Sequence, residues 1–156
     1  MYIRRAGKED VELIVKHFWI PLVQEMSEIE SYHELAEDAE VKAIAKKKKA
    51  LQDEDTVFLI AEIDGDEVGY LKFSIQEVSD VFTRETALHI SELYVKKESR
   101  EQGVASELIQ WAEEYGVERN IDSIELIVDE ANKKALDLYS KRGYSSFRKF
   151  MKKELS

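Results

Sequence analysis

The sequence predicts a mixed α/β fold in which a central β-sheet is flanked by about four helices. Helical stretches and β-rich runs follow one another in the order β-α-α-β-β-β-α-β-α-β. The length of 156 residues suits one domain with a single core. The segment 86–128 is typical of a strand, a helix and a second, parallel strand, joined by a right-handed connection. Residues 1–156 are therefore expected to form a single domain.

The first part of the chain is expected to supply an edge strand and two helices. Residues 2–6 suit the strand, and residues 7–23 place their apolar side chains on one helical face. Pro21, the only proline, is expected to break or kink that helix. Residues 34–55 are rich in helix formers, and their lysine run at 46–49 is interpreted as an exposed, solubilising turn rather than an anion site.

The middle of the chain predicts three antiparallel strands. Residues 56–63 and 67–75 are β-rich and flank an Asp-Gly pair, which is a strong hairpin signal. A third strand is expected at 85–96. Its apolar alternation shifts by one position between Ile90 and Leu93, so we expect a β-bulge near Ser91 and Glu92.

The last third predicts two helices and at least two strands. Residues 104–118 carry a regular apolar stripe, and residues 132–143 form a helix that stops at a glycine. Between them, residues 123–128 are short and nearly all apolar, as expected for a buried strand in parallel pairing. Residues 144–155 are expected to close the fold with one or two strands.

Composition excludes several kinds of protein. The net charge of −10 disfavours a nucleic-acid-binding protein, and no apolar run is long enough to span a membrane. The absence of cysteine rules out disulfides, a thiolate zinc cluster and a cysteine nucleophile. The N-terminus lacks the apolar stretch of a secretory signal. We therefore expect a cytoplasmic protein with neither a nucleic acid nor a membrane as partner.

Charge is unevenly distributed along the chain. Residues 25–40 hold seven acidic and no basic residues, whereas residues 130–156 hold eight basic and three acidic residues. This asymmetry suggests one face that attracts a cation and another that attracts an anion. For the acidic stretch alone, an ordinary solvated surface explains the pattern equally well.

The stretch "SREQGVASELI" at 99–109 lies where a β-rich run passes into a helix. A helix N-terminus offers unpaired N–H groups to an anion, and close approach requires small side chains such as Gly103 and Ala105. Arg100 adds a positive charge. A tight turn without a ligand would also explain the glycine. The segment lacks the features of a nucleotide-triphosphate loop or a dinucleotide fingerprint.

Two segments together make this signal specific. Residues 92–112, "ELYVKKESREQGVASELIQWA", resemble the acetyl-CoA-binding motif of the GNAT superfamily of N-acetyltransferases, in which a strand leads into an Arg/Gln-x-x-Gly-x-Gly/Ala loop and a helix. Residues 132–144, "NKKALDLYSKRGY", resemble the second conserved block of that family. The one departure is Ala105, where many members carry glycine. The resemblance implies an N-acetyltransferase that uses acetyl-CoA (coenzyme A) and acts on a primary amine.

The resemblance also implies roles for individual residues. Leu93, Tyr94 and Val95 would pair with the pantetheine arm of the cofactor, and a backbone N–H near Leu93 would polarise the thioester carbonyl. Asn132 would bind the same arm, although it also suits a helix N-cap. Tyr139 would protonate the leaving thiolate, although it also suits core packing. The residues that would bind the pyrophosphate are Arg100, Glu101, Gln102, Gly103, Val104 and Ala105.

Direct attack on a thioester requires a base, because a primary amine is mostly protonated near neutral pH. Glu92 is the first candidate, because it lies at the expected bulge, where several family members carry an acid. An exposed strand glutamate is the alternative. His89 is the rival base, with a suitable intrinsic pKa. His17 and His33 are weaker candidates.

In the family the amine acceptor binds near the first two helices and the loop between them. That loop falls within the acidic stretch, so the acceptor is expected to be cationic: a polyamine, a lysine side chain or a peptide. The acidic residues that would attract it are Glu25, Glu28, Glu30 and Glu34. Trp19 and Tyr32 are candidates for lining the same pocket, and no metal site is expected.

Two other possibilities stay open. The same fold could serve as a non-catalytic acyl-CoA-binding or regulatory module, because fold alone does not prove chemistry. In addition, an edge strand near residues 144–153 is a candidate for pairing between two chains, which would give a homodimer.

Overall fold

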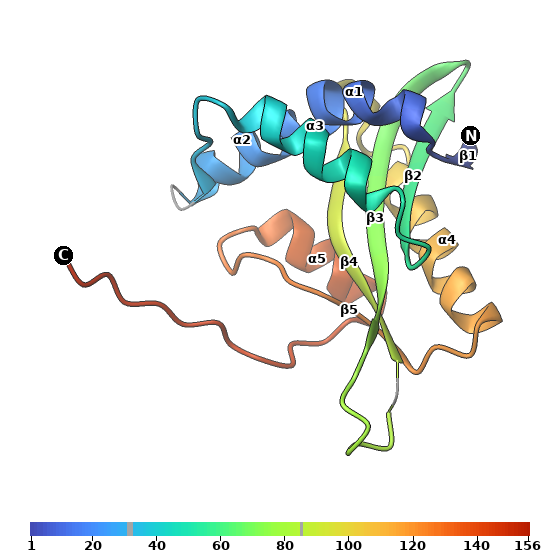
Figure 1. The fold of residues 1–156 in the computed structure, drawn as a ribbon, viewed down its shortest axis with the longest axis vertical. Coiled ribbons are helices and arrows are strands. Elements are labelled where there is room, and N and C mark those ends of the chain that lie inside the picture. The colour runs from blue at the N-terminus through green and yellow to red at the C-terminus, as the bar shows by residue number, and fades with distance from the viewer. Residues whose placement is uncertain (31–32, 85) are drawn as a thin grey trace.

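The computed structural model describes residues 1–30, 33–84 and 86–156, and it contains a five-stranded sheet (Figure 1). The strands lie in chain order across the sheet: β1 (Tyr2–Arg5), β2 (Thr56–Ile63), β3 (Asp66–Glu77), β4 (Thr86–Val95) and β5 (Ser123–Leu126). Strands β1 to β4 pair antiparallel, and β5 pairs parallel with β4. The predicted mixed α/β class is confirmed.

Helices cover both faces of this sheet (Figure 1). One face carries α1 (Val11–Leu13), α2 (Ile20–Ile29) and α3 (Ala39–Ala50). The other carries α4 (Val104–Glu118) and α5 (Lys133–Lys141). Short 3-10 turns at Lys8–Asp10 and Lys97–Ser99 precede α1 and α4.

The first two helices form one helical run, because a π-helical turn at Ile14–Trp19 joins α1 to α2. The prediction that Pro21 breaks the helix is therefore wrong, while the alternative of a kink stays a prediction. Proline has no N–H to donate, and the wider π turn just before it accommodates the missing bond. The second predicted helix, at 34–55, is shorter than expected, because regular α3 begins only at Ala39.

The hairpin and the bulge are confirmed. Asp64 and Gly65 both have positive φ, 52° and 85°, as a two-residue turn between twisted strands requires. Lys72 pairs with Glu92 and Phe73 pairs with Ile90, so Ser91 is the extra residue on β4. The bulge shifts the alternation, so Glu92 projects from the face that carries α1 to α3.

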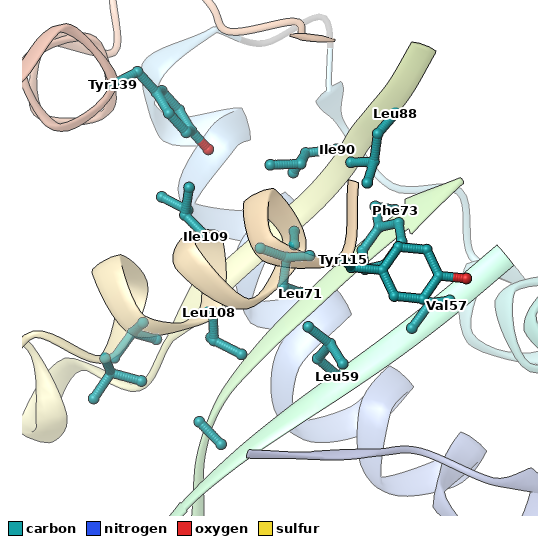
Figure 2. Close-up of a cluster of buried hydrophobic side chains, with 14 of the residues drawn as sticks. Val57, Leu59, Leu71, Phe73, Leu88, Ile90, Leu108, Ile109, Tyr115 and Tyr139 are labelled. Carbon is teal, nitrogen blue, oxygen red and sulfur yellow. The ribbon is translucent and has the colours of Figure 1, made fainter. Parts of the chain in front are cut away.

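The main core lies between the sheet and helices α4 and α5 (Figure 2). Its fully buried side chains include Leu59, Leu71, Phe73, Leu88, Leu108 and Ile109. A smaller aromatic cluster under α1 and α2 contains Ile14, Phe18, Phe58, Ile60, Tyr70 and Tyr94. Strand β4 contributes to both clusters, with Leu88, Ile90 and Val95 in the main core and Tyr94 in the smaller one, so both of its faces are packed.

The C-terminal segment departs from the prediction. Residues 144–156 contain no strand and run away from the sheet after Gly143 (Figure 1). The expected closing strand is therefore wrong for this chain in isolation, because a strand needs a partner edge and this segment leads away from one. Strand β5 consequently lies at the edge of the sheet, only half-buried.

Candidate active site

Strands β4 and β5 separate halfway along β4. Their pairing runs from Ala87 with Ser123 to Ile90 with Leu126 and stops there. Within the described part of the chain, Ser91–Val95 has no strand partner on that side. The backbone of β4 is therefore open next to the bulge, and an extended ligand can pair with it as an added strand would.

The loop after β4 forms a backbone cradle at the start of α4. Glu101 and Gly103 both have positive φ, 63° and 81°. The first bond of α4 runs from the Glu107 N–H to the Gly103 carbonyl, at 3.0 Å. None of the backbone N–H groups of 101–105 donates to an acceptor among the described residues. These groups and the helix dipole can bind an anion.

Gly103 is needed for its backbone conformation rather than for space. A Cβ atom there would meet nothing within 4 Å, but φ is +81°. Residues with a side chain rarely adopt this left-handed conformation. The turn that aims residues 101–105 outward therefore depends on glycine at this position.

Arg100 lies beside this cradle and has its own protein partners. Its guanidinium donates to the Val95 carbonyl at 2.9 Å and to both oxygens of Glu25 at 2.8 and 2.9 Å. The pair ties α2 to the end of β4, and Tyr94 contacts the same carboxylate at 3.4 Å. The role of Arg100 toward a phosphate stays a prediction.

The four predicted acceptor-site glutamates fall into two groups. Glu25 is paired with Arg100, and Glu30 lies 3.7 Å from the Lys152 ammonium. Glu28 and Glu34 are exposed and form no ion pair within the described residues. Of these four glutamates, Glu28 and Glu34 are therefore the two whose negative charge is exposed to solvent without a neighbouring cation among the described residues. The candidate pocket residue Tyr32 lies outside the described residues.

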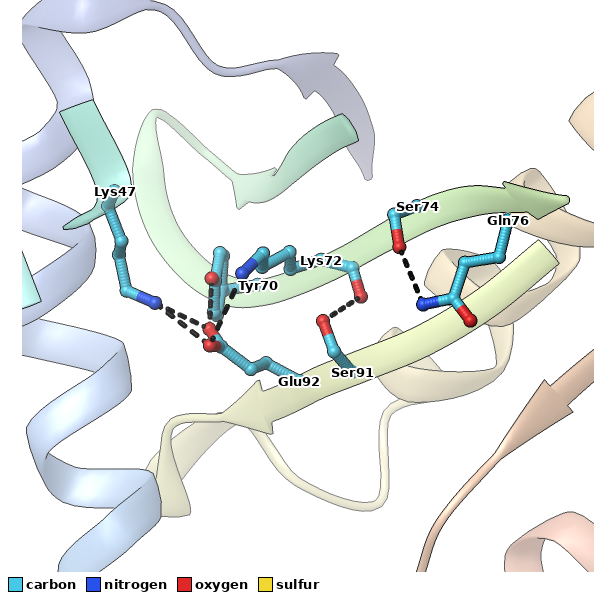
Figure 3. Close-up of polar contacts among 7 residues, drawn as sticks. All are labelled: Lys47, Tyr70, Lys72, Ser74, Gln76, Ser91 and Glu92. Atoms are coloured by element: carbon cyan, nitrogen blue, oxygen red, sulfur yellow. Dashed lines mark hydrogen bonds and ion pairs between the residues drawn. The ribbon is translucent and has the colours of Figure 1, made fainter. Parts of the chain in front are cut away.

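Glu92 is held by a buried network at the bulge (Figure 3). The Lys47 ammonium from α3 donates to its two oxygens at 2.9 and 2.8 Å. The Tyr70 hydroxyl from β3 donates to the same carboxylate, and the Lys72 ammonium lies 3.9 Å away. The Glu92 side chain keeps 15% exposure, and a carboxylate has about four lone-pair sites, more than these hydrogen bonds occupy.

The position of Lys47 corrects the interpretation of the lysine run as an exposed turn. Lys47 is 4% exposed, whereas Lys46, Lys48 and Lys49 are exposed as predicted. The sequence does contain a signal that Lys47 is buried. Lys47 lies four residues after the buried Ala43, and residues with this spacing lie on the same helical face. The ring of Trp19, 5.3 Å away, covers its ammonium.

Burial and the charge of Glu92 oppose each other at Lys47 and act in the same direction at Tyr70. Burial lowers the pKa of Lys47, while the nearby Glu92 carboxylate raises it. Burial and the Glu92 charge both raise the pKa of Tyr70 well above its ordinary value. Tyr70 therefore stays a neutral donor, and the carboxylate is fixed by one buried cation and one phenol.

The three histidines lie apart from Glu92. His89 lies in the closed part of the β4–β5 pairing, with Nδ1 3.6 Å from a Glu125 oxygen. His33 Nε2 lies 2.8 Å from Asp129, which links the chain after α2 to the chain before α5. His17 is exposed on the π-helical turn. Only Glu92 lies at the bulge itself.

Tyr139 and Asn132 both lie on the second predicted motif. The Asn132 side chain accepts the Ala135 N–H at 3.2 Å and caps α5, so its capping role is confirmed. Tyr139 is 9% exposed and reaches from α5 toward Ile90 and Ile109 (Figure 2). Burial raises the pKa of Tyr139 to about 12. It is therefore a protonated phenol that both packs in the core and can donate a proton.

The chain is similar to known acetyltransferases. A model of the acetyltransferase (GNAT) family matches residues 19–144. An uncharacterised N-acetyltransferase of Archaeoglobus fulgidus is 32% identical over 143 residues, which cover 90% of each chain.

Solved structures share the fold. A protein of Bacillus halodurans superposes with a TM-score of 0.87 at 20% identity, covering 99% of this chain and 100% of that one. A predicted acetyltransferase of Clostridium acetobutylicum, solved with acetyl-CoA, has a TM-score of 0.75 at 18% identity, covering 99% and 96%. None of the described helices has the length and apolar character needed to cross a membrane.

Proposed function

The chain belongs to the acetyltransferase (GNAT) family and is an N-acetyltransferase, and we propose that it moves an acetyl group from acetyl-CoA to a cationic primary amine by direct attack. One juxtaposition carries the proposal. The unpaired N–H groups of 101–105, the open edge of β4 and the carboxylate of Glu92 follow one another along a single strand and loop. We also propose that residues 1–156 act as one acetyltransferase domain.

The residues present fit the cofactor. The N–H groups of 101–105 have no acceptor among the described residues and suit the pyrophosphate. The open edge at Leu93–Val95 suits the pantetheine arm, and Asn132, the N-cap of α5, is proposed as a further contact. When bound, acetyl-CoA supplies a thioester as the acetyl donor. A backbone N–H near Leu93 would stabilise negative charge on the carbonyl oxygen.

Two side chains would handle the protons. Glu92 takes a proton from the ammonium form of the acceptor, directly or through one water molecule, using the lone pairs that Lys47 and Tyr70 leave free. Tyr139 gives a proton to the departing sulfur, because burial keeps its hydroxyl protonated. The amine would therefore attack as a neutral nucleophile, and its nitrogen would lose a second proton to water after it bonds to carbon. The thiol would leave as a neutral group, and water would return a proton to Tyr139.

The proposal is tested by thiol release from acetyl-CoA in the presence of polyamines, amino acids, aminoglycosides and lysine peptides. The chain contains no cysteine, so a thiol reagent reports coenzyme A alone. We expect release that depends on a cationic amine. If acetyl-CoA raises the melting temperature but no amine causes release, transfer to a cationic amine is contradicted.

Tyr139→Phe is expected to lower kcat about 100-fold, because the leaving thiolate then departs without a proton. Because the pKa of Tyr139 is raised to about 12, the wild-type rate should show no decline from this group as pH rises to about 10. Steady-state kinetics across pH would measure both. Tyr144→Phe is the matched control, because it also removes one phenol hydroxyl, but from a tyrosine with no proposed role in the transfer. The Tyr144 hydroxyl contacts Glu113 at 3.2 Å. Wild-type kcat in Tyr139→Phe would contradict the role.

The paired change Glu28→Gln and Glu34→Gln is expected to raise the acceptor KM by about three- to tenfold, because each removes an exposed attraction for a cation. The KM for acetyl-CoA should stay unchanged. Glu114→Gln with Glu118→Gln removes the same charge from exposed positions on α4 and serves as the control. An acceptor KM equal in the two double variants would refute the assignment of Glu28 and Glu34.

A further inference from the structure

The lysine beside the proposed base is itself a primary amine, and it lies where the nitrogen of an acceptor has to lie. A general base takes a proton from a nitrogen within hydrogen-bond distance, about 2.6–3.2 Å. The Lys47 nitrogen lies 2.9 and 2.8 Å from the two Glu92 oxygens (Figure 3). The chain therefore already holds one primary amine in the contact with Glu92 that acetyl transfer requires.

The surroundings of the Lys47 nitrogen favour its neutral, nucleophilic form. Within the described residues, both of its hydrogen bonds go to the Glu92 carboxylate. The ring centres of Trp19, Phe58 and Tyr70 lie 5.3, 5.9 and 6.0 Å from it. Burial lowers the pKa of Lys47 by more than the Glu92 charge raises it. Less free energy is therefore needed to deprotonate Lys47 than a lysine in water.

The proposed acetyl position is next to the same carboxylate. Leu93 follows Glu92 on β4, and its N–H is the group proposed to polarise the thioester carbonyl. Neighbouring residues have Cα atoms only about 3.8 Å apart. The flexible four-carbon stem of a lysine allows its nitrogen to move from Glu92 toward a carbonyl at this adjacent position. Nucleophile, base and carbonyl donor therefore lie together at the bulge.

We propose that this chain acetylates itself on Lys47, an inference that rests on the proposed function and adds an acceptor within the chain. Glu92 takes one proton from the Lys47 ammonium, the neutral nitrogen bonds to the acetyl carbon, and the carbon–sulfur bond breaks. Tyr139 protonates the sulfur and regains its proton from water. The nitrogen loses a second proton to water, and so does the Glu92 carboxyl. The products are one amide, one coenzyme A thiol and one proton released to the solvent.

Mass spectrometry of the full chain, incubated with isotope-labelled acetyl-CoA and no acceptor, tests this inference. The label distinguishes the reaction from acetylation before purification. Lys46, Lys48 and Lys49 are exposed and serve as an internal reference, because direct chemical acetylation favours exposed lysines over Lys47, which is 4% exposed. We expect labelling at Lys47 to be at least about tenfold faster than at these three, since the base and the acetyl group are held beside it. Equal or slower labelling at Lys47 would overturn the proposal.

Three variants assign the label to this site and to this base. Lys47→Arg keeps a cation beside Glu92 and should lose the rapid labelling. Lys72→Arg is the matched control, because the Lys72 ammonium lies 3.9 Å from Glu92, and it should keep that labelling. Glu92→Gln, with an unchanged circular dichroism spectrum, should slow it about 100-fold. Rapid labelling that is lost in Lys72→Arg but not in Lys47→Arg, or that is unchanged in Glu92→Gln, contradicts the assignment.

Further measurements separate a failure of this inference from a failure of the proposed function. If acetyl-CoA raises the melting temperature and an amine causes thiol release, but Lys47 stays unlabelled, only self-acetylation is overturned. If acetyl-CoA neither raises the melting temperature nor releases thiol with any amine, both are overturned. Diluting the chain at saturating acetyl-CoA should leave the labelling rate unchanged, because the transfer is intramolecular. A rate that falls with dilution would show transfer between chains and overturn self-acetylation.

Discussion

Lys47→Met is expected to lower the free energy of unfolding by about 3 kcal/mol, because the largely buried Glu92 carboxylate then keeps only the more distant Lys72 ammonium, 3.9 Å away. Lys47 is 4% exposed, and the Glu92 side chain is 15% exposed. Water can therefore replace the lost ammonium only in part. Methionine keeps the length and the apolar stem of the side chain, so the loss reports the charge rather than a cavity. Urea unfolding at equilibrium would measure the change.

Two further variants make this prediction specific. Lys46→Met changes an exposed neighbour on the same helix and should alter stability by no more than about 0.5 kcal/mol. The double variant Lys47→Met, Glu92→Gln should recover part of the loss, since an amide is much cheaper to bury than a charge. If Lys47→Met is as stable as Lys46→Met, the network contributes nothing to folding.

Glu92→Gln is expected to lower kcat by about 100- to 10,000-fold, because an amide of nearly the same shape cannot take a proton from the acceptor. The rate of this variant should recover as pH rises toward the pKa of the acceptor, since more of the amine is then already neutral. Steady-state kinetics across pH with the acceptor found by the thiol assay would measure both effects. The KM for acetyl-CoA should change little.

Controls for Glu92→Gln separate chemistry from folding. Glu92→Asp keeps a carboxylate on a side chain one methylene shorter. Both variants disturb the contact with Lys47, but only the aspartate can still take a proton, so it should retain more activity than the glutamine variant. His89→Gln tests the rival base in the closed part of the β4–β5 pairing and should leave kcat nearly unchanged. A large loss in His89→Gln together with an active Glu92→Gln would transfer the base role to the histidine.

The network explains why one carboxylate is expected to affect both stability and rate. Lys47 and Tyr70 come from α3 and β3, and each holds the Glu92 side chain in one orientation. A base held in one orientation spends no free energy on ordering when the substrate arrives. The cost is a buried charge, which the fold tolerates only because the cation is buried with it.

Several features were determined by the sequence alone, because each depends on neighbours along the chain. Asp64 and Gly65 specify the hairpin, and a one-residue shift in apolar alternation specifies the bulge at Ser91. The spacing of Gly103 and Ala105 after β4 specifies the loop. These patterns are local, so periodicity and backbone conformation suffice to read them.

Tertiary structure alone decided which charges meet. Lys47 and Glu92 are 45 residues apart, and Glu25 and Arg100 are 75 residues apart. A lysine in a run of lysines and a glutamate in an acidic stretch look solvated in the sequence, because nothing nearby indicates a partner. The free energy of burying a charge depends on the distance to an opposite charge in space, and only the folded chain sets that distance.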